Sequence, residues 1–195
     1  MKIAIIGWGS LIWCQKGLRL VSKWKKNGPK LPIEFSRISK CDRLTLVIDP
    51  DGTEVITYWA ESPFKYLKKA RENLKAREGA DKIDAIHFII RNGKVHKEVC
   101  EGVRNIMIKW LNNKRSIDAV IWTGLKSNWC KERRRAFSSK DAIDYLKDLK
   151  KRKKEKLAKE YITMAPRQIN TSLRRRIRKD LHWTDIRLSA NLFEP

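Results

Sequence analysis

The chain has 195 residues and a mass of 23.0 kDa, and its 45 Lys and Arg residues against 22 Asp and Glu residues give a formal net charge of +23. A hydrophobic fraction of 42% with eight Trp residues argues against a disordered chain, because it supplies enough apolar surface for a core. No run of about 18 apolar residues is present, so we expect no membrane span. The short apolar start ends at Gly7, which argues against a signal peptide.

Four cysteines lie at positions 14, 41, 100 and 130, and no C-x-x-C pair occurs. This spacing argues against a zinc site and against a thioredoxin-like redox motif. A chain of this size needs no disulfide framework to fold. We therefore expect four free thiols, no metal site and a cytoplasmic protein.

The first part of the chain reads as a series of short strands. We expect strands at 2–6, 33–38, 44–48 and 54–59, where β-branched and aromatic residues are frequent. A glycine-containing loop, Gly7 to Trp13, follows the first of them. The sequence Asp49-Pro50-Asp51-Gly52 predicts a hairpin turn between the last two.

The clearest helix is expected from Pro63 to Gly79. Ser62 is suited to cap it, Pro63 fits the first helical position, and Gly79 fits the end. Strands at 83–90 and 94–99 flank Asn92-Gly93, which favours a type I′ hairpin. In that register His87 and His96 are not cross-strand partners. A helix at 103–111 and a strand at 119–123 complete this part.

The remaining residues read as helices. Ser138 with Asp141 predicts a capped helix start, and that helix is expected to reach Lys159. A last, basic helix is expected from Thr171 to Leu181. Many strands early and helices late predict an α+β fold with a largely antiparallel sheet. We divide the chain into a domain of residues 1–125 and a basic, mostly helical C-terminal extension of residues 126–195.

The loop after the first strand fits neither of two familiar glycine motifs. A dinucleotide-binding G-x-G-x-x-G would need glycine at position 12, where Ile12 stands. A nucleophile elbow around Ser10 would need glycines in place of Trp8 and Ile12. What remains is a strand end, two glycines and a hydroxyl, which could form a small anion-binding concavity. The alternative is an ordinary turn with a core tryptophan.

Glu78 is the candidate catalytic residue of the predicted helix. At 100° per residue it falls on the apolar stripe formed by Leu67, Ala70 and Leu74, while Glu72 falls on the outer face. Burial raises the pKa of a carboxylic acid, and a raised pKa suits a general acid or base. The alternative is a frayed helix end where Glu78 reaches water. Arg71, beside the stripe, is a candidate partner for one of these carboxylates.

The strongly basic C-terminal region is a candidate nucleic-acid surface. Residues 126–195 hold 21 basic and 9 acidic side chains. The run 147–159 and the basic residues of 174–179 could bind phosphates, and Trp129 and Trp183 could stack on bases. The alternatives are a solvated helix surface or a general bias toward lysine.

Two motifs together resemble the γ-glutamylcyclotransferase superfamily. Gly7-Trp8-Gly9-Ser10-Leu11-Ile12-Trp13 is similar to its GYGSLIW signature loop, and Leu74-Lys75-Ala76-Arg77-Glu78-Gly79 is similar to its L-x-x-x-E-G segment. The resemblance covers residues 1–125. Trp8 stands where the family has tyrosine, and residues 126–195 have no counterpart.

The resemblance implies a curved, largely antiparallel sheet or barrel with surrounding helices. It implies an enzyme that cyclises a γ-glutamyl amide or peptide, such as glutathione, to 5-oxoproline, with Glu78 as general acid/base and no cofactor. Gly7, Trp8, Gly9, Ser10 and Leu11 would bind the γ-glutamyl unit. Two other hypotheses remain open: a nucleic-acid-binding protein that uses the fold as a scaffold, and a non-catalytic module that binds an acidic small molecule.

Overall fold

A computed structural model of the chain describes residues 1–186 and 192. The described residues form two compact units, the first made of residues 1–31 and 56–124 and the second of residues 32–55 and 125–186. The fold is α+β, as predicted, with six α-helices and two mostly antiparallel sheets. The described strands form no closed barrel, so that variant of the prediction is wrong.

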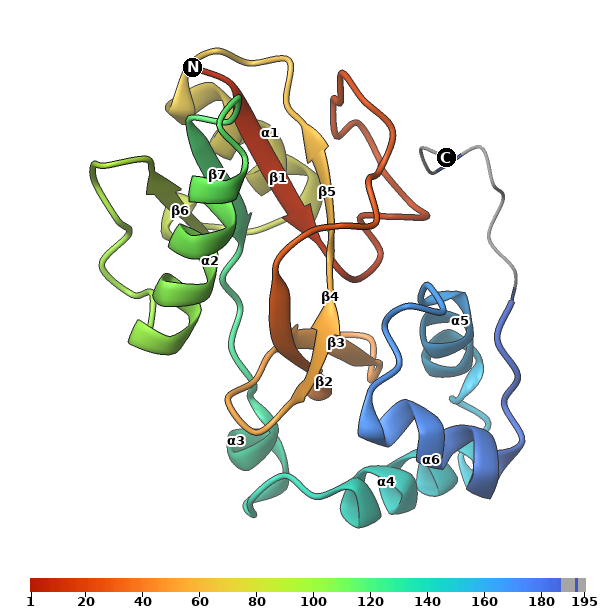
Figure 1. The fold of residues 1–195 in the computed structure, drawn as a ribbon. Helices are drawn as coiled ribbons and strands as arrows, with labels where there is room; N and C mark the ends of the chain where they lie inside the picture. The colour runs from red at the N-terminus through yellow and green to blue at the C-terminus, as the bar shows by residue number, and fades with distance from the viewer. Residues whose placement is uncertain (187–191, 193–195) are drawn as a thin grey trace. The chain divides into compact units, whose positions relative to one another are not determined.

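The sheet of the first unit has the strand order β5-β1-β7-β6 (Figure 1). Its strands are β1 (Ile3–Gly7), β5 (Tyr58–Glu61), β6 (Ile86–Ile90) and β7 (Ala119–Thr123). β1 runs antiparallel to β5 but parallel to β7, and β6 runs antiparallel to β7. Every residue of β1 is buried, as expected for a central strand covered on both faces.

Two helices cover this sheet. α1 (Leu67–Glu78) and α2 (Glu101–Asn113) both pack against β6 and β7, and in Figure 1 α2 lies in front of the sheet and α1 behind it. A 3₁₀ turn, η1 (Ile83–Ala85), leads into β6. α1 buries Ala70 and Leu74, which fixes the orientation of the helix and therefore the position of its last residue, Glu78.

The predicted end of α1 is confirmed and its predicted start is wrong. Gly79 adopts the left-handed conformation, with φ 61°, and its amide donates to the carbonyl of Ala76. The helix begins at Leu67 rather than at Pro63. Ser62 does not cap it, because its hydroxyl accepts a hydrogen bond from the amide of Phe64 (3.3 Å) and so closes a local turn.

The hairpin after β6 has a different register from the predicted one. Val95 lies opposite Ile89, and the amide of His96 donates to the carbonyl of Phe88 (2.9 Å). Of the two turn residues only Asn92 has a positive φ, so the turn is not type I′. The one-residue shift places the rings of His87 and His96 in a stack, with centroids 4.5 Å apart.

The stacked histidine His87 makes Gly124 a position where we expect no side chain to be tolerated. A Cβ atom at Gly124 would lie 2.2 Å from Nε2 of His87, whose ring also packs edge-on against Trp122. Gly124→Ala should therefore lower the free energy of unfolding by about 1–3 kcal/mol through overpacking. Urea unfolding followed by circular dichroism measures this loss.

Gly102, in the exposed first turn of α2, is the matched control. No atom lies within 4 Å of a Cβ built there. Gly102→Ala should raise stability slightly, since alanine is the better helix residue. Equal stability of the two alanine variants would contradict the tight contact at Gly124.

The second unit contains a three-stranded sheet of order β3-β2-β4. Its strands are β2 (Lys30–Ile38), β3 (Leu44–Ile48) and β4 (Thr53–Ile56), and the ends of β2 and β4 extend into the first unit. β2 pairs antiparallel with β3. The single strand predicted at 54–59 is in fact two strands, because the chain leaves one sheet after β4 and joins the other at β5.

Four helices complete the second unit: α3 (Trp129–Arg133), α4 (Ser139–Lys151), α5 (Lys156–Met164) and α6 (Ser172–Leu181). Ser138 caps α4 by accepting from the amide of Asp141 (3.0 Å), as predicted. The predicted continuous helix to Lys159 is wrong, because the chain turns between α4 and α5. Lys153, within that turn, has a φ of 56°.

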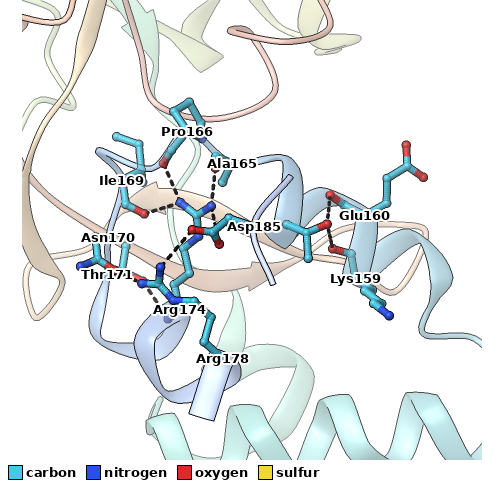
Figure 2. Close-up of polar contacts among 11 residues, drawn as sticks. Lys159, Glu160, Ala165, Pro166, Ile169, Asn170, Thr171, Arg174, Arg178 and Asp185 are labelled. Carbon is cyan, nitrogen blue, oxygen red and sulfur yellow. Dashed lines mark hydrogen bonds and ion pairs between the residues drawn. The ribbon is translucent and has the colours of Figure 1, made fainter. Parts of the chain in front are cut away.

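The core of the second unit contains buried ionisable side chains, among them Arg174 and Glu34. α4 packs against α6, and α5 packs against β3. Arg174 of α6 is fully buried; its guanidinium donates to backbone carbonyls and pairs with Asp185 (2.9 Å; Figure 2). Glu34 of β2 accepts from the amides of Phe35 and Leu173, and burial raises the pKa of its carboxyl group.

The compact units do not follow the predicted division of the chain in one respect. Residues 32–55 belong with the helical region 125–186 rather than with the rest of the first 125 residues. The C-terminal helices are therefore part of a unit with its own sheet. None of the helices in the described part of the chain is long and apolar enough to cross a membrane.

Candidate functional site

The loop after β1 forms a tight turn. The carbonyl of Gly9 accepts from the amide of Ile12 (3.0 Å), and that of Ser10 accepts from the amide of Cys14 (2.9 Å). Trp8 and Leu11 are buried, and Ser10 remains partly exposed. Backbone amides of a turn that contains glycine can donate to an anionic group.

Packing at the start of this turn leaves little room for a side chain at position 7. A Cβ atom there would lie 3.0 Å from the indole ring of Trp24, which is fully buried. The glycine therefore lets the chain end β1 directly against the core of the first unit. Of the predicted loop residues, only Ser10 thus presents a partly exposed polar side chain.

Glu78, the other predicted site residue, is the last residue of α1 and is largely buried. Only 17% of its side chain is exposed, so it does not simply reach water at a frayed helix end. Burial raises the pKa of the Glu78 carboxyl group. The charge of Arg77 and a hydrogen bond from it act in the opposite direction, as does the charge of Lys16.

Arg77 connects the two motifs. Its Nη1 donates to Oε1 of Glu78 (2.7 Å), while its Nη2 donates to Oγ of Ser10 (3.0 Å) and to the carbonyl of Cys14 (2.6 Å). The side chain is only 6% exposed. One guanidinium therefore holds the turn after β1 against the end of α1, and Ser10 and Glu78 share a partner although they are far apart in the sequence.

Arg77 was not among the residues predicted from the sequence, and Arg71 has a role different from the predicted one. Arg71 donates to the carbonyls of Ile83 and Ile86 and lies over the ring of Phe88. Arg71 therefore links α1 to η1 and β6 through hydrogen bonds. The available signal for Arg77 was its position next to a carboxylate on a buried stripe, where a counter-charge is needed.

The arrangement has the elements of acid–base chemistry. Glu78 is a carboxylic acid whose pKa is raised by burial, which brings it nearer to the neutral range where proton transfer is effective. Ser10 accepts a hydrogen bond from Arg77, so its own hydroxyl proton remains available to a ligand. Arg77 fixes both groups in position.

Other candidate residues are placed differently. His87 and His96 are buried in the first unit, and no group of three or more His, Cys, Asp or Glu side chains among the described residues could hold a metal ion. All four cysteines are unpaired thiols. Trp129 and Trp183 are buried, so the prediction that they stack on nucleic-acid bases is wrong.

Both predicted motifs thus meet in the first unit, around Arg77. Comparison with known protein families, with curated proteins and with solved structures finds no match for this chain.

Proposed function

We propose that the chain is a γ-glutamylcyclotransferase-like enzyme that converts a γ-glutamyl amide or peptide to 5-oxoproline and a free amine. The proposal extends to the finer fold, which we place in the same superfamily. The observation that carries it is the Arg77 guanidinium bound to both Glu78 and Ser10. The two sequence motifs resemble those of one superfamily, and in this chain they share one hydrogen-bonding group.

In the proposed reaction the substrate attacks itself. Glu78 takes a proton from the α-ammonium group, and the resulting amine attacks the γ-carbonyl carbon. A carbon–nitrogen bond forms and closes the five-membered ring. The bond from the γ-carbonyl carbon to the departing nitrogen then breaks, and the proton held by Glu78 passes to that nitrogen. The new ring nitrogen releases its second proton, which the departing amine takes up at neutral pH. The reaction consumes no cofactor, and holding the substrate in a folded conformation supplies much of the rate.

The turn after β1 would bind the γ-glutamyl unit. The amides at its start can donate to the oxygen that becomes negative when the amine adds to the carbonyl. The Ser10 hydroxyl, held by Arg77, adds a side-chain donor. Trp8 stands where the resembling family has tyrosine and is only 6% exposed, so it serves the core and offers no hydroxyl to the substrate.

Arg77 acts as a positioning residue in this proposal. Its charge and hydrogen bond lower the pKa of Glu78, whereas burial, the larger effect, raises it. The net effect is a pKa above that of an ordinary glutamate, which makes Glu78 a stronger base for the first step and still lets it release the proton in the second. Arg77 itself is too deeply buried, at 6% exposure, to be the main substrate contact.

The test is incubation with glutathione and a panel of γ-glutamyl amines, with 5-oxoproline detected by mass spectrometry. We expect 5-oxoproline and the matching free amine in equal amounts from at least one substrate. Isothermal titration with the same panel runs in parallel. Binding without any product would contradict catalysis and support a non-catalytic binding module. The absence of both binding and product would contradict the site itself.

A further inference from the structure

Outside this site, the second unit contains a short segment in which exposed, positively charged side chains are concentrated. We call residues 147–156 the basic segment; it covers the last turns of α4, the turn that follows and the start of α5. Seven of its ten residues are Lys or Arg and two are acidic. All seven basic side chains are exposed: Lys147, Lys150, Lys151, Arg152, Lys153, Lys154 and Lys156.

Most of these charges are not neutralised by the protein. Arg152 pairs with Asp148 (2.7 Å), and Lys154 lies 4.0 Å from Asp42. Among the residues that the structure describes, no carboxylate forms an ion pair with the other five, which are Lys147, Lys150, Lys151, Lys153 and Lys156. The segment therefore keeps a net positive surface.

Stability of the helices explains only part of this charge. Lys150 and Lys151 lie in the last turn of α4, where the helix dipole favours cations. Lys154 precedes α5 and Lys156 is its first residue, where the dipole disfavours cations. Glu155 stands at the N-cap, but the first turn of α5 contains no acidic residue. Local helix electrostatics thus gives no reason for the lysines at the start of α5, whereas an external anion would.

We propose that the basic segment binds the phosphate backbone of double-stranded nucleic acid without reading its sequence. Exposed Lys and Arg side chains that replace condensed counterions supply this kind of binding. A duplex presents phosphates at short, regular intervals, so several cations in one short segment engage it together. The binding is independent of the reaction proposed for the first unit.

The placement of the aromatic residues favours a duplex over a single strand. Single-strand binding without sequence preference uses exposed aromatic rings on which bases stack. In the described part of the second unit no Phe, Tyr or Trp side chain is fully exposed: Phe137 is half-buried, and Trp129, Tyr145 and Trp183 are buried in its core. Of the two modes of binding, contact through the phosphates of a duplex is therefore the one that this surface supports.

The apolar residues favour nucleic acid over a membrane surface. A helix that lies in a membrane interface presents large apolar side chains next to its lysines. The apolar residue of the basic segment is Leu149, which is fully buried. Leu157, the next residue of α5, is 46% exposed, but one apolar side chain beside seven cations does not make the apolar face of an interfacial helix.

The test measures fluorescence anisotropy of a labelled 20-base-pair duplex of random sequence, titrated with the full chain at several salt concentrations. The probe variant is Lys150→Gln, Lys151→Gln, Lys153→Gln in one chain. Since each phosphate contact contributes about 0.9 to the slope of log K against log salt, the variant should reduce the slope by about 3. We also expect at least a tenfold weaker affinity at about 0.1 M salt.

The control variant carries Lys68→Gln, Lys69→Gln and Lys82→Gln, three exposed lysines of the first unit. This variant loses the same number of positive charges as the probe variant, and its affinity for the duplex should stay within about twofold of that of the unchanged chain. Equal weakening in both variants would overturn the proposal, since net charge alone would then explain the binding. Vesicles of phosphatidylcholine and phosphatidylserine (3:1) are titrated in parallel; binding to vesicles with none to the duplex would also overturn it.

Discussion

Glu78→Gln is expected to lower the rate of 5-oxoproline formation by about 10²–10⁴-fold, the range for loss of a positioned general acid/base. Glutamine is isosteric, and its amide oxygen can still accept from Nη1 of Arg77 (2.7 Å in the present chain). The contact between α1 and the turn after β1 is thereby kept. Turnover and product are measured by mass spectrometry, and folding by circular dichroism.

The pH dependence gives a second readout of the same residue. The base form of Glu78 is the ionised one, so kcat/KM should fall as the pH drops through the pKa of this group. Because burial raises that pKa, the fall should lie above the range of an ordinary glutamate. Any residual kcat/KM of Glu78→Gln should not show this fall at low pH.

Glu78→Gln should not unfold the chain. With a raised pKa in the folded state, the stabilising contribution of Glu78 belongs to its protonated form and is lost as the pH rises through the raised value. At neutral pH the neutral glutamine therefore avoids the cost of burying an ionised carboxylate. It leaves the Arg77 charge without its partner, and the net change in stability should be small.

Glu72→Gln is the matched control for catalysis. Glu72 lies on the same helix but is exposed. We expect unchanged turnover and an unchanged pH profile in this variant. Wild-type turnover in Glu78→Gln, or an equal loss in Glu72→Gln, would refute the role assigned to Glu78.

Arg174→Met should lower the free energy of unfolding of the second unit by about 3–5 kcal/mol, as expected when one member of a buried ion pair is removed. Arg174 is fully buried and pairs with Asp185 (2.9 Å). Its guanidinium also donates to the carbonyls of Ala165, Pro166 and Ile169 (Figure 2). The substitution leaves three acceptors in the interior without this donor.

The side chain of methionine is close in length to that of arginine, so it fills much of the same space but donates no hydrogen bond. Asp185 keeps a second partner, Arg178 (2.9 Å), which limits the loss from the carboxylate. Most of the expected destabilisation therefore comes from the carbonyl groups of the segment between α5 and α6. The measurement is urea unfolding, monitored both by circular dichroism and by tryptophan fluorescence.

Arg175→Met is the matched control, because Arg175 is the next residue of α6 and is exposed. Arg175 donates to the carbonyl of Asn170 and to the hydroxyl of Ser172 at the surface. Its replacement should change stability by less than about 0.5 kcal/mol. If the two variants unfolded at the same urea concentration, the buried arginine would contribute nothing specific to the second unit.

Several elements could be predicted from the sequence because local rules decide them. β3 at 44–48 and β7 at 119–123 were predicted with their observed bounds. Gly79 ends α1 and Ser138 caps α4, each through hydrogen bonds within a few residues. The position of Glu78 on the apolar stripe followed from helical periodicity, and it is largely buried.

Other features depend on contacts that the local sequence does not contain. The strand predicted at 54–59 is split because β4 and β5 pair with different sheets. The register after β6 differs by one residue from the turn rule, and this brings His87 onto His96. The start of α1 moved because the Ser62 hydroxyl closes a turn instead of capping the helix.

The sequence by itself determined the α+β class, the charge and the two motifs of the candidate site, since these depend on composition and short-range periodicity. Only the tertiary structure decided that Arg77 joins Ser10 to Glu78, that residues 32–55 belong with the C-terminal helices, and that Trp129 and Trp183 are buried. The physical reason is that a side chain on the helix surface or in a loop finds its partner through long-range packing. Spacing along the chain limits which face a residue lies on, but the partner on that face is set by the fold.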